Sequence, residues 1–144
     1  MENHEQWLAR AQSNLELAKV EHGATVFNED LCFQAQQAAE KGLKALLLFY
    51  GEEPDKTHNL VTLVQKIATR VAMPTAIKEV VILNNYAVQT RYPGDYTPVT
   101  TAEYENAVRV AGDCLQWVKE KLSVAPPDSL FRDDAAEREE RSRK

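Results

Sequence analysis

Residues 31–49 form a segment that is apolar or small around most of a helical cylinder. A row of mainly small residues repeats through it at alternating spacings of four and three. Small side chains in such a row let the backbone of a second helix approach closely. A helix of this kind lies either at the centre of a bundle or in an interface between subunits. The row consists of Leu31, Ala35, Ala38, Gly42, Ala45 and Phe49.

Helical periodicity extends over most of the chain, and no segment alternates with period two for long enough to indicate a strand. Gly23, Gly51 and the turn at residues 92–94 mark expected helix ends. Thr100 and Glu103 have the spacing of a capping box, which opens a last helix. The pattern predicts an all-α bundle of four to five helices. The positions expected to face the core are Leu8, Ala11, Leu15 and Ala18, then Leu60, Leu63, Val64, Ile67 and Val71, then Ile77, Val80, Val81 and Val88, and finally Tyr104, Val108, Ala111, Leu115, Val118 and Leu122.

The composition is that of one globular domain with a tail. The 144 residues are 44% hydrophobic and 27% charged, which suits a single core. We assign residues 1–125 to the domain and residues 126–144, where a proline pair precedes an almost entirely charged stretch, to a flexible tail. The net charge of −5 argues against a protein whose whole surface binds nucleic acid, although a local basic groove stays open.

The sequence also indicates the compartment. No apolar run approaches the roughly 20 residues that a membrane helix requires, and the acidic residues at the N-terminus do not resemble a secretory signal. Cys32 and Cys114 stand alone, so neither a disulfide nor a zinc site is predicted. We therefore expect a cytoplasmic protein with no metal site of its own.

Polar residues within the 31–49 segment gather on one face. Gln37, Lys41 and Lys44 share this face, and Glu40 precedes Lys44 by one helical turn, so the two can pair. Two interpretations are open at this point. The face is either a solvated stripe with a surface ion pair, or a polar groove beside an interface.

A second candidate region follows the fourth predicted helix. Arg91 ends that helix, and a tight Pro-Gly turn then presents Tyr92, Asp95 and Tyr96. Arg91 can satisfy the free carbonyls of the helix end, or it can bind a phosphate while a tyrosine stacks on a base. His58, before the third helix, is interpreted as a capping or loop histidine, since no spacing of His or Cys residues indicates a metal site.

Residues 33–45 resemble the signature helix of the HEPN domain family. Residues 58–60, placed after a short loop, and residues 91–95 strengthen the resemblance by their order along the chain. The resemblance extends from about Trp7 to Leu122. It implies an up-and-down antiparallel bundle of four long helices plus a shorter one, usually in a symmetric dimer. It also implies that the polar face of the second helix and the end of the fourth lie beside the cleft between subunits.

The resemblance carries expectations about function as well. Small prokaryotic HEPN proteins typically pair with a minimal nucleotidyltransferase, and several are metal-independent ribonucleases that act as toxins or defence effectors. Those ribonucleases carry an arginine followed four to six residues later by a histidine. No histidine follows Arg91 at that distance, and Tyr96 occupies the first such position. An ordinary phenol titrates near about pH 10 and is a poor general base at neutral pH.

Three functions follow from these observations. The favoured one is a dimeric nucleotide- or substrate-binding subunit of a minimal nucleotidyltransferase, of the toxin-antitoxin type of pair, with no catalysis in the isolated chain. The alternative is a metal-independent ribonuclease toxin that uses Arg91 with Tyr96 or His58. The third is a non-catalytic dimerisation scaffold. The favoured function predicts a nucleotide or RNA ligand, no cofactor in the chain itself, and metal only through the partner. The residues predicted to bind the nucleotide are Gln37, Lys41, Lys44, Arg91, Tyr92, Asp95 and Tyr96.

Overall fold

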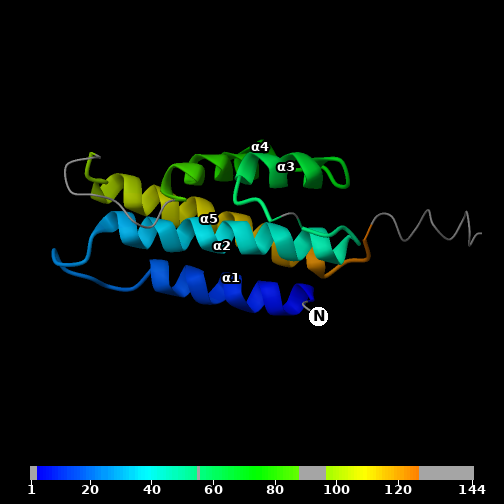
Figure 1. Cartoon of the computed structure of the whole chain (residues 1–144), viewed down its shortest axis with the longest axis horizontal. Helices are drawn as coiled ribbons and strands as arrows, with labels where there is room; N and C mark the ends of the chain where they lie inside the picture. Colours follow the sequence, from blue (N-terminus) through cyan, green and yellow to red (C-terminus); the bar gives the residue numbers. More distant parts are fainter. Residues whose placement is uncertain (1–2, 55, 88–96, 127–144) are drawn as a thin grey trace, which may run out of the picture.

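The computed structural model describes residues 3–54, 56–87 and 97–126. Within these ranges the chain is helical and contains no strand (Figure 1), which confirms the all-α prediction. The predicted tail, apart from Pro126, lies outside the described residues. In chain order the elements are α1 (His4–Ala18), α2 (Asn28–Phe49), α3 (Leu60–Ala68), α4 (Thr75–Lys78), the 3-10 helix η1 (Glu79–Tyr86) and α5 (Thr101–Leu122).

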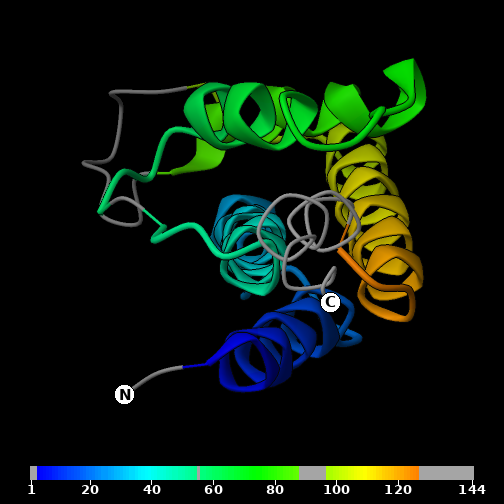
Figure 2. The same cartoon turned by 90° about the vertical axis from the view of Figure 1, so that its right-hand side faces the viewer.

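Helix α2 lies at the centre of the bundle, with α1, α3 and α5 arranged around it (Figure 2). Ala35, Ala38 and Ala45 in its row of small residues are fully buried within the single chain. At Gly42 a Cβ atom would lie only 2.9 Å from Cδ1 of Leu115 on α5, so the absence of a side chain lets these two helices approach. Of the two locations open for this row, the centre of the bundle is the one observed. A charge at Ala38 would therefore disturb the core rather than report on a subunit interface.

Two helix ends follow the signals in the sequence. Gly51 has φ +89° and stands just after α2, and backbone hydrogen bonds from Gly51 N to Leu48 O (3.0 Å) and from Glu52 N to Leu47 O (2.9 Å) complete a Schellman motif. At the start of α5, Thr100 and Glu103 form the predicted capping box. By contrast, α1 ends at Ala18, well before Gly23.

The connection between α2 and α3 is anchored at both ends. After α3, Arg70 reaches back, and its Nε donates to Oε2 of Glu52 at 2.9 Å while a terminal nitrogen donates to the carbonyl of Tyr50 at 3.2 Å. At the other end, Asn59 caps α3 by accepting from Val61 N at 2.9 Å. The side chain of Asn84, on η1, donates to Asn59 and accepts from the first amide of α3, as expected for a hydrogen-bonded polar group in an apolar stripe.

The fourth predicted helix differs from expectation. After one α-helical turn, α4, the chain continues as the 3-10 helix η1. A 3-10 helix has three residues per turn, so residues three apart share a face. Ile77, Val80, Leu83 and Tyr86 accordingly pack against the core, and Leu83, which a spacing of 3.6 did not place inward, is fully buried. Val88, which was expected to face inward, lies outside the described residues.

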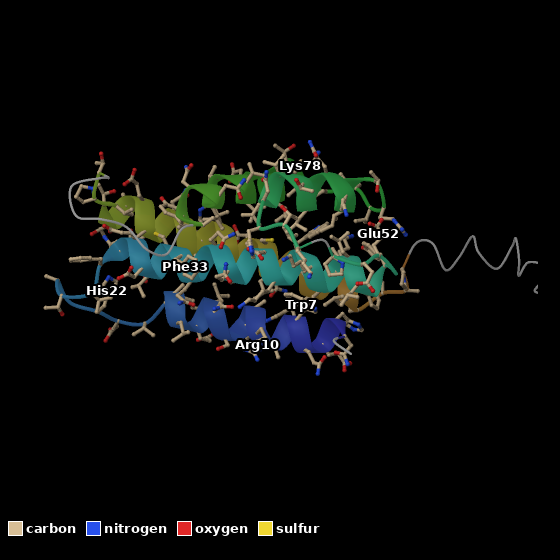
Figure 3. All side chains as sticks on the ribbon, in the orientation of Figure 1. Trp7, Arg10, His22, Phe33, Glu52 and Lys78 are labelled. Carbon is tan, nitrogen blue, oxygen red and sulfur yellow. The ribbon has the colours of Figure 1, made fainter. Side chains whose placement is uncertain are left out.

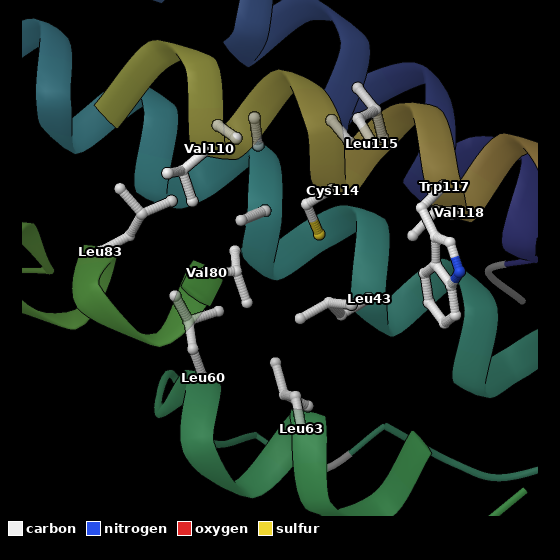
Figure 4. Close-up of a cluster of buried hydrophobic side chains, with 14 of the residues drawn as sticks. Leu43, Leu60, Leu63, Val80, Leu83, Val110, Cys114, Leu115, Trp117 and Val118 are labelled. Atoms are coloured by element: carbon white, nitrogen blue, oxygen red, sulfur yellow. The ribbon is translucent and has the colours of Figure 1, made fainter. Parts of the chain in front are cut away.

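The main core forms where α2, α3, η1 and α5 meet (Figure 4). The labelled side chains of this core are Leu43 of α2, Leu60 and Leu63 of α3, Val80 and Leu83 of η1, and Val110, Cys114, Leu115, Trp117 and Val118 of α5.

None of the described helices is long and apolar enough to cross a membrane.

Candidate functional site on the polar face of helix α2

One continuous arc of α2 carries the polar side chains of its middle part, from Gln34 to Lys44. With 3.6 residues per turn, this arc lies on the opposite side of the helix from Gly42, the point of closest approach to α5. One edge of the arc faces α1, and the other faces the connection between α2 and α3. We call this arc the polar face of α2. Taken from the α1 edge, it consists of Gln34, Lys41, Gln37, Lys44, Glu40 and Gln36.

Glu40 is the centre of a buried hydrogen-bond network on this face. Its Oε2 accepts from Nζ of Lys44 at 2.9 Å and lies 2.8 Å from Nδ1 of His58. Its Oε1 accepts from Nε2 of Gln36 at 3.1 Å, and Gln37 donates to Gln36 at 2.7 Å. Residues Glu40 and Lys44 are only 2% and 4% exposed. The predicted pairing is thus confirmed. Of the two interpretations left open, the solvated stripe with a surface ion pair is wrong, because this pair is buried.

The network keeps the Glu40 carboxyl charged. Burial alone would raise the pKa of Glu40, because it disfavours the charged form. The hydrogen bonds from Lys44, His58 and Gln36 more than offset this effect, so the pKa of Glu40 lies below its ordinary value. A buried carboxylate with several donors is therefore a fixed negative charge in the middle of the polar face.

His58 is oriented by this fixed charge. Its side chain is 73% exposed even though its Nδ1 meets the buried Glu40 carboxylate. A carboxylate favours the tautomer that carries the proton on Nδ1, which leaves the lone pair of a neutral ring on Nε2. The imidazole can therefore accept a proton, or a hydrogen bond, at its second nitrogen. Spacing in the sequence did not indicate that His58 would contact this face.

A groove runs along the other edge of the polar face, between α1 and α2. It has a volume of about 590 Å³ and is open to solvent. Lys41 contributes from α2, and its Nζ donates to Asn14 at 3.0 Å, which in turn donates to Gln34 at 2.7 Å. Trp7 and Arg10, labelled in Figure 3, come from α1. The residues that line the groove are Gln6, Trp7, Ala9, Arg10, Ser13 and Lys41.

The groove is positively charged, because it is lined by the cations Arg10 and Lys41. Burial lowers the pKa of Lys41, and the nearby Arg10 lowers it further, because two like charges oppose each other. Neither Arg10 nor Lys41 forms an ion pair with any residue of the three described ranges. Nζ of Lys44 lies 5.5 Å from the centre of the Trp7 ring, which joins the groove to the Glu40 network.

The structure thus brings together part of the predicted site. Gln37, Lys41 and Lys44 share one face as expected, although the ammonium of Lys44 is held by Glu40. Among the residues described, no three His, Cys, Asp or Glu side chains gather as metal ligands. Arg91, Tyr92, Asp95 and Tyr96 lie outside the described residues.

Sequence reasoning missed Trp7, Arg10 and Asn14 as neighbours of Lys41. Their contribution depends on how α1 packs against α2, and residues on different helices share no spacing signal. The one available hint was the spacing of Trp7 and Arg10, which are three apart and so share a face of α1.

Comparisons with known proteins identify the family of this bundle. The sequence model of the HEPN domain matches residues 4–121. The chain is similar to the crystal structure of ST0689, an archaeal HEPN homologue, with 29% identity and a TM-score of 0.67 over 85% of this chain and 99% of that chain. It is also similar to the crystal structure of TT1696 from Thermus thermophilus, with 33% identity and a TM-score of 0.71 over 84% of this chain and 99% of that chain. No curated protein matches. The chain therefore belongs to the HEPN domain family.

Proposed function

We propose that this HEPN protein is a dimeric nucleotide-binding subunit that acts with a minimal nucleotidyltransferase. The observation that carries the proposal is the polar face of α2. Polar groups on a central helix cost free energy unless they are hydrogen-bonded, and here they are bonded to one another and to His58. Near the α1 edge the face carries the Lys41 ammonium, and toward the other edge Glu40 holds the exposed imidazole of His58. A phosphate and the polar edge of a base are chemically suited to these two groups.

The remaining predicted ligands keep their proposed roles. Arg91 makes forked contacts to phosphate, and Tyr92 or Tyr96 stacks on a base, while Asp95 stays among the predicted nucleotide-binding residues. Lys44 acts through Glu40 instead of touching the nucleotide, because its ammonium is committed to that carboxylate. In this proposal the second subunit completes the cleft, and the partner enzyme supplies metal and catalysis.

Nucleotide binding by the purified chain tests the proposal. We expect saturable binding of at least one of ATP, GTP, CTP and UTP in equilibrium dialysis, and a dimer in light scattering. Removing the forked contact in Arg91→Ala is expected to weaken binding roughly tenfold or more, since a charged hydrogen bond contributes about 1.5–3 kcal/mol. Lys78→Ala is the matched control, because Lys78 is an exposed cation on α4, away from α1 (Figure 3). Absence of saturable binding for all four nucleotides would contradict the proposal.

A second candidate function, metal-independent ribonuclease activity, is favoured by the contact between Glu40 and His58. A neutral imidazole held in this way can take the proton of an RNA 2′-hydroxyl at Nε2. The 2′-oxygen then bonds to the adjacent phosphorus, the bond from phosphorus to the 5′-oxygen breaks, and that oxygen takes a proton from water. The imidazolium returns its proton to the hydroxide that remains, which regenerates the neutral base. The products are a 2′,3′-cyclic phosphate and a 5′-hydroxyl.

RNA cleavage in the presence of chelator tests this second function. If His58 is the general base, His58→Gln is expected to reduce cleavage by about 10²–10⁴-fold without loss of fold, because the side chain is mostly exposed. His4→Gln is the histidine control, since His4 lies at the start of α1 with its ring against Phe49. Cleavage that survives in His58→Gln excludes this role. A chain that neither cleaves RNA nor binds nucleotide, but is a dimer in light scattering, supports the dimerisation scaffold.

A further inference from the structure

The groove between α1 and α2 gathers two cations, an aromatic ring and two neutral polar side chains in one open hollow. We propose that this groove is the nucleotide site, and that it holds a nucleoside polyphosphate with its phosphates between Arg10 and Lys41 and its base against Trp7. This inference rests on the proposed function and names the place and the class of ligand. In this inference Arg10 and Lys41 contact the phosphates, and Trp7 stacks on the base, in place of Arg91 and the two tyrosines. Arg91→Ala and Arg10→Gln therefore distinguish the two arrangements.

The two cations favour a ligand with more than one negative charge. Arg10 and Lys41 come from different helices, repel each other, and form no ion pair with the described part of the chain. An anion between them would relieve this repulsion, and partial burial of Lys41 strengthens the attraction because less water screens it. A guanidinium fork beside a point-like ammonium suits two neighbouring phosphates.

The other lining groups fit the rest of a nucleotide. Trp7 offers an aromatic ring on which a base can stack, and base stacking on aromatic side chains tolerates any base. Ser13 adds a hydroxyl, and Gln6 adds an amide nitrogen whose oxygen is bound by Asn3 N in the capping box of α1, and both groups can bind a ribose or the edge of the base. The volume of about 590 Å³ lies within the range of roughly 300–1,000 Å³ that is typical of small-molecule sites.

A second hollow in the described part of the chain lacks the pair of cations that lines the groove. It lies between the connection from α1 to α2 and the start of α5, and it has a volume of about 460 Å³. Among the described residues, its lining contains the acidic Glu29 and the imidazole of His22, but no lysine or arginine. An anionic ligand therefore has an electrostatic reason to prefer the groove beside α1.

Trp7 makes the proposal measurable. The chain has two tryptophans, and the other, Trp117, is buried on α5. In the full-length Trp117→Phe protein, the tryptophan fluorescence, excited at a wavelength that tyrosine does not absorb, comes from Trp7 alone. We expect ATP to quench this fluorescence, adenosine to bind at least tenfold more weakly, and inorganic tripolyphosphate to compete with ATP. Arg10→Gln and Lys41→Gln are each expected to raise the ATP dissociation constant tenfold or more, whereas Lys78→Ala leaves it unchanged.

Equilibrium dialysis of ATP with the same variants separates the inference from the proposed function. If ATP binds the double variant Arg10→Gln, Lys41→Gln as tightly as it binds the parent, the groove is not the site, although nucleotide binding stands. If the parent itself binds none of the four nucleotides, both the groove and the proposed function are overturned. The groove is supported as the nucleotide site if ATP quenches Trp7 and if both single variants lose ATP binding while their circular dichroism spectra stay unchanged.

Discussion

Glu40→Ala is expected to lower the free energy of unfolding by about 3–5 kcal/mol, because it leaves a buried charge without its partner. Lys44 is 4% exposed, and Glu40 is the carboxylate that pairs with it. The substitution also removes the acceptor of Gln36, which is fully buried. Urea unfolding at pH 7, followed by circular dichroism at 222 nm, measures the change.

The double variant Glu40→Gln, Lys44→Met is the matched control for this prediction. It removes both charges, keeps an oxygen that can accept from Gln36, and leaves His58 a neutral partner. Replacing a buried ion pair by neutral groups of similar volume is often nearly neutral in stability. We therefore expect this variant to recover most of the loss. A Glu40→Ala protein within about 1 kcal/mol of the parent would show that water, and not Glu40, solvates the Lys44 ammonium in solution.

Leu115→Ala is expected to cost about 2–5 kcal/mol, the usual range for a buried leucine that leaves a cavity. Leu115 is 1% exposed and touches α2 at Gly42. In the parent, Gly42→Ala would bring a methyl group to 2.9 Å from Leu115 Cδ1, and such overpacking costs about 1–3 kcal/mol. Alanine in place of glycine inside a helix gains about 1 kcal/mol, so the single change is expected to be neutral or destabilising.

The same Gly42→Ala change is expected to become stabilising by about 1 kcal/mol when Leu115 is already alanine, because the clash is gone and the helix propensity remains. A double-mutant cycle from urea unfolding of the four proteins measures this coupling. Ala107→Gly, at a buried position on α5 away from Gly42, serves as the comparison. Its effect on the free energy of unfolding is expected to be additive with that of Leu115→Ala. Additivity at Gly42 would mean that Leu115 moves aside at no cost.

Local signals in the sequence predicted most of the fold. The capping box at Thr100 and Glu103 and the glycine after α2 specify helix ends through nearby backbone groups, so they can be found without the structure. The 3-10 helix η1 was missed because its apolar residues fit a spacing of 3.6 nearly as well as a spacing of three over so short a segment. Leu83 shows the difference, since only the tighter helix places it in the core.

The candidate site was predictable only where it lies on one helix. Gln37, Lys41 and Lys44 share a face of α2 because of helical geometry alone. The burial of the Glu40–Lys44 pair could not be predicted, because it depends on side chains from other elements, such as Trp7 on α1 and His58 before α3. An ion pair four residues apart looks the same in sequence whether it is exposed or covered.

The anchored connection between α2 and α3 has a consequence for the entropy of binding. Arg70 holds the chain where α2 ends, and Asn59 holds it where α3 begins. His58 directly precedes Asn59, and its Nδ1 already contacts Glu40, so the residue has few conformations left to lose. The imidazole of His58 therefore faces any ligand from a pre-organised position, and little ordering free energy is subtracted from the affinity when a ligand binds there.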